Sequence, residues 1–177
     1  GDKLSYIEQD SGEVIECDVL VCSLPYSGLT YAIPVRSQKQ EELILGVCCA
    51  LHYIGGVPLS IVFDNMKSAV KRSSRYEPEF TEAIELLGLH YNTTIMATRP
   101  YKPKDKAHVE RSVNITYQRI FAPLRDIQFF SLEELKKEVL QLVNELNNRK
   151  LSQGHRSRKE VFDEEENNIC AHKHISR

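Results

Sequence analysis

The sequence contains no apolar run near the roughly 18 residues that a membrane-spanning helix needs. It begins without the basic and apolar segments of a secretory signal peptide, so we expect a soluble protein of the cytoplasm. Glycine and proline, at 8 and 7 of 177 residues, are too scarce for a collagen-like or low-complexity chain. The five cysteines follow no disulfide-like pattern, and we expect them to be reduced. These absences leave a globular domain with an ordinary core.

An excess of positive charge is also absent, because the net charge is -2. A chain without a general positive potential has to bind nucleic acid, if it does so at all, through local patches. Basic residues gather in three stretches, at 65–76, 99–111 and 149–159. Acidic residues within 1–20 and 163–166 offset the positive charge of these stretches, so the net charge of the chain stays near zero. Any nucleic-acid contact is therefore expected in these three stretches.

The first third of the sequence has the pattern of antiparallel strands. Apolar and β-branched residues predict strands at 4–7, 14–17, 19–24 and 29–35. Gly12 and Gly28 stand where the connecting turns need glycine.

The pattern then alternates between helix and strand. It predicts helices at 38–54, 78–87, 105–124 and 131–147, and strands at 59–63 and 93–98. Ser131 and Glu134 form a capping box at the start of the last helix. We therefore expect an α/β fold whose mixed sheet has three or more antiparallel strands followed by parallel strands, with helices on both faces. Beyond residue 150 the chain is polar, and we expect it to be loosely held.

Two acidic residues stand at positions that suit a metal site. Asp64 follows a buried strand, and ligands gather at the carboxyl ends of strands in open α/β sheets. Glu110 lies in the first turns of a helix, where the helix dipole favours its charged form. Taken singly, Asp64 could close an Asx turn and Glu110 could be a solvated helix residue. Taken together, they predict a site for a divalent cation.

Three runs around these residues resemble the catalytic core of IstA-type insertion-sequence transposases, which belong to the retroviral integrase superfamily. The runs are IVFDNMKSAV at 61–70, YEP at 76–78 and RPYKPKDKAHVE at 99–110. The resemblance extends from residue 1 to about residue 165. It implies a ribonuclease-H-like catalytic core at 1–150, with its first strand truncated at the N-terminus, and a polar C-terminal extension at 151–177.

The resemblance also implies a metal-dependent enzyme, a DDE transposase, in which an Asp-Asp-Glu triad binds two Mg²⁺ or Mn²⁺ ions. Water cleaves a phosphodiester at the transposon end, and the freed 3′-hydroxyl then attacks target DNA. Asp64 matches the second Asp of the triad and Glu110 matches the Glu. The first Asp of the family pattern falls just upstream of Gly1, and Asp2, Asp10 and Asp18 do not match it. We therefore expect this chain alone to be inactive or nearly so.

The same resemblance suggests partners and a DNA-contacting surface. We expect DNA contacts from residues beside the two carboxylates, namely Asn65, Lys67, Lys71, Arg99, Lys102, Lys104 and Lys106. The expected partners are transposon ends, target DNA, an ATP-binding helper protein and further copies of the chain on DNA, without a membrane. The expected location is the bacterial cytoplasm, at the nucleoid when the protein is on DNA.

Two other functions remain open, a nuclease of the same fold and a non-catalytic DNA-binding or assembly module. Two weaker candidate sites also remain. Cys170, His172 and His174 could bind zinc, although three such residues near a terminus are more often incidental. His108 could touch substrate, although a helix-surface histidine is the commoner interpretation.

Overall fold

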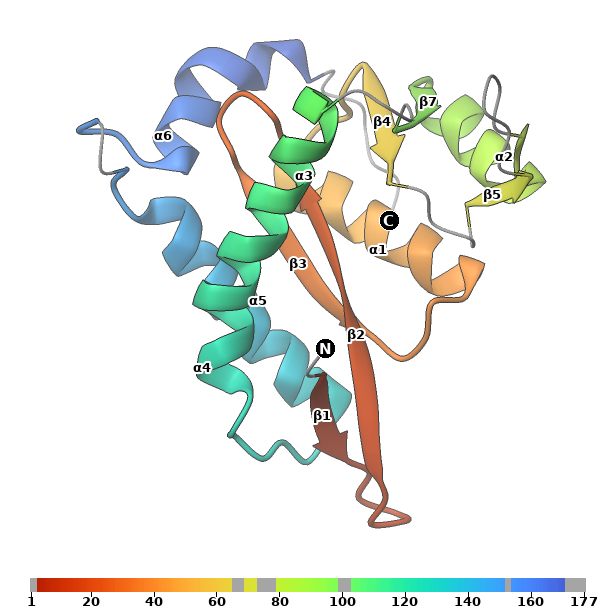
Figure 1. Cartoon of the computed structure of the whole chain (residues 1–177), viewed down its shortest axis with the longest axis vertical. Coiled ribbons are helices and arrows are strands. Elements are labelled where there is room, and N and C mark those ends of the chain that lie inside the picture. Colours follow the sequence, from red (N-terminus) through yellow and green to blue (C-terminus); the bar gives the residue numbers. More distant parts are fainter. Residues whose placement is uncertain (1–2, 65–68, 73–78, 99–102, 152–153, 171–177) are drawn as a thin grey trace.

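The computed structural model describes residues 3–64, 69–72, 79–98, 103–151 and 154–170 (Figure 1). The first strands form an antiparallel sheet in the order β1-β2-β3. Its strands are β1 (Leu4–Ile7), β2 (Val14–Ser23) and β3 (Thr30–Val35). Gly12 and Gly28 have φ of 71° and 70° in the two turns, which confirms their predicted role.

Strand β2 is continuous where the sequence predicted two strands on either side of Asp18. The Asp18 carboxylate lies 3.8 Å from Lys3 Nζ, so the charge is accommodated within the strand. The two halves of β2 have different neighbours. Residues 14–17 pair with β1, from Leu4 opposite Cys17 onward, and residues 18–23 pair with β3.

A parallel pair of strands follows the antiparallel sheet, as predicted. Its elements are α1 (Gln40–Ile54), β4 (Ser60–Phe63), α2 (Glu82–Tyr91) and β7 (Thr94–Ala97). Strands β4 and β7 run in register from Ser60 opposite Thr94 to Phe63 opposite Ala97. Within the described residues, this pair is a hydrogen-bonded unit separate from β1-β2-β3.

Between β4 and α2 lies a small pair of antiparallel strands, which the sequence pattern did not predict. Strand β5 (Val70–Arg72) pairs antiparallel with β6 (Glu79–Phe80). Phe80 was predicted to lie on the face of a helix, and that assignment was wrong because α2 begins only after Thr81, whose backbone is extended. Phe80 still packs against the apolar cluster around α1 and α2, so its apolar character did not distinguish strand from helix.

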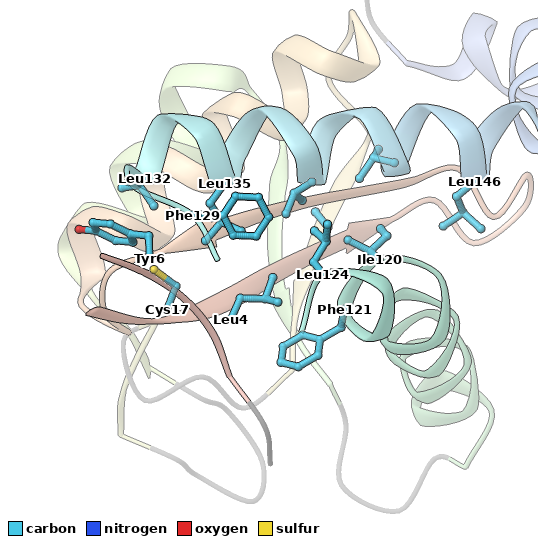
Figure 2. Packing of buried hydrophobic residues seen from close by; sticks show 13 residues of the cluster. Leu4, Tyr6, Cys17, Ile120, Phe121, Leu124, Phe129, Leu132, Leu135 and Leu146 are labelled. Carbon is cyan, nitrogen blue, oxygen red and sulfur yellow. The ribbon is translucent and has the colours of Figure 1, made fainter. Parts of the chain in front are cut away.

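Helices cover both faces of the antiparallel sheet. On one face α1 lies so close that a side chain at Gly46 would collide with Leu20 of β2. On the other face α5 (Leu132–Asn148) inserts Leu135, Val139 and Val143, all fully buried, into the cluster drawn in Figure 2. The Ser131 hydroxyl accepts the Glu134 N–H, and the Glu134 carboxylate accepts the Phe130 N–H. None of the described helices is long and apolar enough to cross a bilayer.

The helix predicted at 105–124 changes its winding along its length. It consists of α3 (Pro103–Thr116), a π-helical turn η1 (Tyr117–Phe121) and α4 (Ala122–Leu124). The widened turn lies just before Pro123, whose ring would clash with the Arg119 carbonyl in a regular α-helix. Ile120, fully buried in the same turn, fixes this segment against α5.

The segment after residue 150 is folded where the structure describes it. It contains α6 (Arg158–Val161), η2 (Phe162–Glu166) and η3 (Asn167–Ile169). Phe162 is 2% exposed and packs with Leu24 and Leu29 beside the β2–β3 turn. The expectation of a loosely held extension is therefore wrong for residues 154–170, because a capped helix and one apolar anchor hold them.

We predict that Ser157→Ala destabilises the protein by about 1 kcal/mol, because Ser157 and Glu160 form a complete capping box at α6. Ser157→Asp retains an acceptor for the Glu160 N–H and should keep most of the stability. Urea unfolding measures both variants. Equal stability of the Ala and Asp variants would show that the cap contributes nothing.

Candidate metal and nucleic-acid site

Asp64 lies at the carboxyl end of the parallel strands, with an exposed side chain. Its Oδ1 accepts a hydrogen bond of 2.9 Å from the hydroxyl of Thr98, the residue that follows β7. The Thr98 N–H also donates to the Phe63 carbonyl at 3.0 Å, just before Asp64. These two bonds join the ends of β4 and β7 and hold the Asp64 carboxylate at that edge.

Glu110 lies on α3, about two turns after its first residue, and its side chain is exposed. Only residues 99–102 separate Thr98, the partner of Asp64, from the start of α3. The turn of α3 that contains Glu110 and Ser112 is attached to the end of β2, because the Ser112 hydroxyl accepts a 2.9 Å hydrogen bond from the Ser23 hydroxyl. In Figure 1 the carboxyl end of β4 and the start of α3 both lie in the upper part of the molecule. The Asp64 carboxylate is thus held by the residue that follows β7, and the helix of Glu110 is held by the end of β2.

The donor chemistry of these two residues fits a hard divalent cation, because carboxylate oxygens are the ligands that Mg²⁺ and Mn²⁺ take in proteins. Two carboxylates alone form a sparse site. Among the described residues, no group of three or more His, Cys, Asp or Glu side chains is arranged to hold a metal ion.

The predicted DNA-contacting residues fall mostly outside what the structure describes. Four of them lie outside the described residues, namely Asn65, Lys67, Arg99 and Lys102. For the other three only the backbone is described, with Lys71 in β5 and Lys104 and Lys106 in the first turn of α3. His108 is also in α3 with its side chain undescribed, and His172 and His174 lie beyond residue 170.

Sequence reasoning did not single out Thr98, Ser23 or Ser112. Thr98 carried a usable signal, because it is a polar residue directly after a strand that pairs in parallel with β4. The hydrogen bond between Ser23 and Ser112 joins residues 89 positions apart, and no local sequence pattern predicts it.

Burial favours the protonated thiol in two of the cysteines, Cys22 and Cys170. All five are free thiols in the structure, and burial raises the pKa of Cys22 to about 12. Burial also raises the pKa of Cys170, which is 3% exposed. Thiols held in the protonated form are poor metal ligands and poor nucleophiles.

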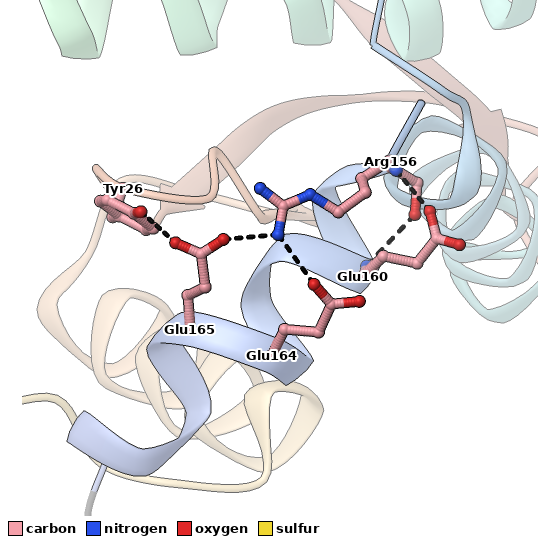
Figure 3. A network of polar contacts seen from close by, with 6 residues as sticks. Tyr26, Arg156, Glu160, Glu164 and Glu165 are labelled. Atoms are coloured by element: carbon pink, nitrogen blue, oxygen red, sulfur yellow. Dashed lines mark hydrogen bonds and ion pairs between the residues drawn. The ribbon is translucent and has the colours of Figure 1, made fainter. Parts of the chain in front are cut away.

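A polar network holds the C-terminal segment against the β2–β3 turn (Figure 3). The Tyr26 hydroxyl donates to Glu165, and Arg156 Nη1 binds Glu164 at 2.7 Å and Glu165 on its other side. The hydrogen bond from Tyr26, followed by the one from Arg156, lowers the pKa of Glu165. The buried Glu166 accepts the Ser27 N–H at 3.1 Å. These contacts position the segment and pair Arg156 with two carboxylates.

Comparison with known proteins finds relatives over most of the chain, while no family model matches it. The chain is 36% identical over 163 residues to the "Putative transposase for insertion sequence IS408" of Burkholderia multivorans. It is 38% identical over 164 residues to the "Putative transposase y4bL/y4kJ/y4tB" of Sinorhizobium fredii. These alignments cover 92% and 93% of this chain and 32% of each relative. The chain therefore spans about a third of the length of the curated relatives it matches.

Solved structures with the same fold are catalytic cores of retroviral integrases. The core of BIV integrase superposes with a TM-score of 0.65 at 17% identity, and 93% of each chain is covered. The HTLV-2 integrase core in complex with magnesium gives a TM-score of 0.60 at 16% identity, with 91% and 92% of the two chains covered. At these identities the likeness shows the fold, which is the ribonuclease-H-like α/β fold predicted above.

Proposed function

This chain belongs with the insertion-sequence transposases across about nine-tenths of its length, and on that premise we propose that it is the catalytic core of a DDE-type DNA transposase. The reaction is cleavage of a phosphodiester at the 3′ end of the transposon, followed by transfer of that end to target DNA. The observation that carries the proposal is the position of Asp64. Asp64 directly follows the parallel strand β4 and accepts a hydrogen bond from Thr98. Five residues after Thr98 the chain enters α3, the helix that carries Glu110.

Asp64 and Glu110 are the proposed metal ligands. The carboxylate character of both side chains supports this assignment, and a structural neighbour of the same fold is a complex with magnesium. Two bound Mg²⁺ or Mn²⁺ ions would activate the attacking oxygen and stabilise the leaving oxygen of the phosphodiester. The role of the chain is to orient the carboxylates, and the Thr98 hydroxyl does so for Asp64.

The register of β1 supports a third carboxylate supplied from upstream of Gly1. Leu4 lies opposite Cys17, and β2 continues six residues beyond Cys17 to Ser23. Continuing the register residue by residue would place the first three upstream positions beside Val21, Cys22 and Ser23. Because Ser23 donates to Ser112, two residues after Glu110, a carboxylate there would come close to the α3 site.

The remaining assignments follow from the family. The proposed DNA-contacting residues are Asn65, Lys67, Lys71, Arg99, Lys102, Lys104 and Lys106, in segments that adjoin Asp64 and Glu110. The proposed partners are transposon ends, target DNA, further copies of the chain and an ATP-binding helper protein. One structural neighbour belongs to an intasome, the assembly of integrase on DNA, which supports oligomer formation. The proposed location is the bacterial cytoplasm, at the nucleoid.

A strand-transfer assay tests the proposal. The protein, extended at its N-terminus by its upstream residues, is mixed with labelled DNA from the ends of the element, a target plasmid and Mg²⁺. A joined product of donor and target is expected. Cleavage without joining would identify a nuclease of the same fold. DNA binding without cleavage would identify a non-catalytic assembly module.

We predict that Thr98→Val weakens Mn²⁺ binding by the extended protein about tenfold, because loss of a partner that orients a metal ligand typically costs ten- to a hundredfold in affinity. Valine keeps the size of the side chain and removes the hydroxyl that donates to Asp64. Thr98→Ser retains the hydroxyl and should bind the ion almost as the parent does. Isothermal titration calorimetry measures all three. Unchanged affinity in Thr98→Val would show that the contact does not orient a ligand.

A further inference from the structure

Two arginines are brought together where the chain turns from α5 into α6. Lys150 and Ser157 pair as an antiparallel bridge, and the Leu151 N–H donates to the Arg156 carbonyl at 3.1 Å. Arg149 and Arg158 are the next residues outward on the two sides of this bridge. Arg158 is half-buried, and its Nη1 donates to the Leu146 carbonyl, 3.2 Å away, at the end of α5. The bridge therefore places Arg149 and Arg158 at facing positions on the two sides of the turn.

A third arginine approaches from the π-helical turn. Arg119 precedes Ile120, which is fully buried in the same apolar cluster as Leu146, so η1 is held next to the end of α5. Burial lowers the pKa of the Arg158 guanidinium, and the neighbouring charges of Arg119 and Arg149 lower it further. We call Arg119, Arg149 and Arg158 the arginine cluster. Three like charges held together repel one another, so an anion between them would relieve that repulsion.

The described part of the chain supplies no carboxylate to this cluster. None of its three members has an ion pair with a described acidic residue. In the α6–η2 segment, Glu164 and Glu165 bind Arg156, and Asp163 binds Lys159 at 2.6 Å (Figure 3 shows the Arg156 contacts). Glu160 accepts the Ser157 N–H, and Glu145 of α5 accepts a hydrogen bond from Gln141. The same segment thus pairs two of its basic residues internally and leaves the arginine cluster for an external anion.

We propose that the arginine cluster is a phosphate-binding site for the DNA backbone, separate from the residues next to Asp64 and Glu110. This inference rests on the proposed function for its choice of DNA as the ligand. Guanidinium groups present a planar fork of N–H donors that matches phosphate oxygens in a bidentate manner, and they stay charged at any physiological pH. Arg119 and Arg149 are exposed, so a phosphate can reach them from solvent.

The position of the cluster gives its distance from the proposed active site along the helix. Arg119 lies nine positions after Glu110 on the continuous helix α3–η1. At 1.5 Å per residue this is about 13 Å along the axis. One strand of a duplex advances 3.4 Å per nucleotide, so a duplex that runs along α3 would reach the cluster roughly four nucleotides from the reacting phosphate. It would hold the same DNA molecule that the active site cleaves.

Fluorescence anisotropy with a labelled duplex of about 30 base pairs tests the site, using the 177-residue chain in EDTA at a series of KCl concentrations. Arg119→Gln and Arg149→Gln should each weaken binding severalfold and reduce the slope of log K against log salt by about one. Lys159→Gln is the matched control, because it removes one positive charge beside Arg158 from a residue already paired with Asp163. It should change the affinity less than twofold and leave the slope unchanged. Arg158 is left intact because it also contacts the Leu146 carbonyl.

Two results would overturn the proposal. In the first, Arg119→Gln and Arg149→Gln bind DNA as Lys159→Gln does. In the second, polyglutamate displaces the labelled duplex more effectively than unlabelled DNA of the same total charge. That result would mean that the arginine cluster binds an acidic protein surface and not DNA. The assay contains no divalent ion and includes no cleavage or joining step, so its result does not depend on the proposed metal ligands. A failure of the proposed catalysis would therefore leave this binding result intact, and the two failures are distinguishable.

Discussion

Asp64→Asn and Glu110→Gln are each expected to reduce Mg²⁺-dependent strand transfer at least a hundredfold in the protein extended by its upstream residues. The amide replacements keep the size of the side chain and remove the negative charge that a hard cation requires. Loss of a partner that merely orients a ligand costs ten- to a hundredfold, so loss of the ligand itself should cost more. Gel analysis of the joined DNA product measures the effect over several orders of magnitude.

Asp10→Asn is the matched control for these variants. Asp10 is an exposed acidic residue in the β1–β2 turn, away from β4 and α3, and its replacement should leave strand transfer unchanged. The double variant of Asp64 and Glu110 should be little worse than either single variant, because residues that act as one unit are not additive. If Asp64→Asn retained half of the parent rate, the metal assignment would be wrong.

Asn147→Ala is expected to destabilise the protein by about 3 to 4 kcal/mol, the largest stability effect that we predict for a single replacement. Asn147 is 1% exposed and binds the backbone of Thr30 twice. Its Oδ1 accepts the Thr30 N–H at 3.0 Å, and its Nδ2 donates to the Thr30 carbonyl at 2.7 Å. Alanine would leave both backbone groups buried without partners, and each such group costs about 1 to 3 kcal/mol.

The Asn147 side chain also donates to the Tyr53 hydroxyl at 3.0 Å and so links α5, β3 and α1. The neighbouring Asn148 is exposed, and its side chain donates to the Asn144 carbonyl of its own helix. Asn148→Ala should therefore change the stability by less than about 0.5 kcal/mol. Urea unfolding of the two variants side by side measures the difference. Equal stabilities would contradict the role assigned to Asn147.

The helix α5 shows what the sequence predicted well. Its start was identified at Ser131 from a capping box, and its buried face was identified from the spacing of Leu135, Val139 and Val143. Both signals lie within one helix, so they required no knowledge of distant residues. The structure confirms the Ser131 cap and the buried face, while the Glu134 carboxylate accepts the Phe130 N–H and not the Ser131 N–H of a full capping box.

The missed features depend on residues far apart in the sequence. The polar segment at 154–170 folds because Phe162 enters a pocket formed by Leu24 and Leu29, which its own composition did not indicate. The side-chain contact between Asp64 and Thr98 joins two strand ends that are 34 residues apart. Sequence placed Asp64 at the end of its strand but gave no means of choosing its hydrogen-bond partner.

Anomalous diffraction from Mn²⁺-soaked crystals of the extended protein tests the central claim most directly. The account predicts an anomalous peak within roughly 2.0 to 2.5 Å of a carboxylate oxygen of Asp64, together with an ion bound by Glu110 in the same site. A Mn²⁺ peak that contacts neither residue, or carboxylates that bind ions in two unconnected places, would contradict it.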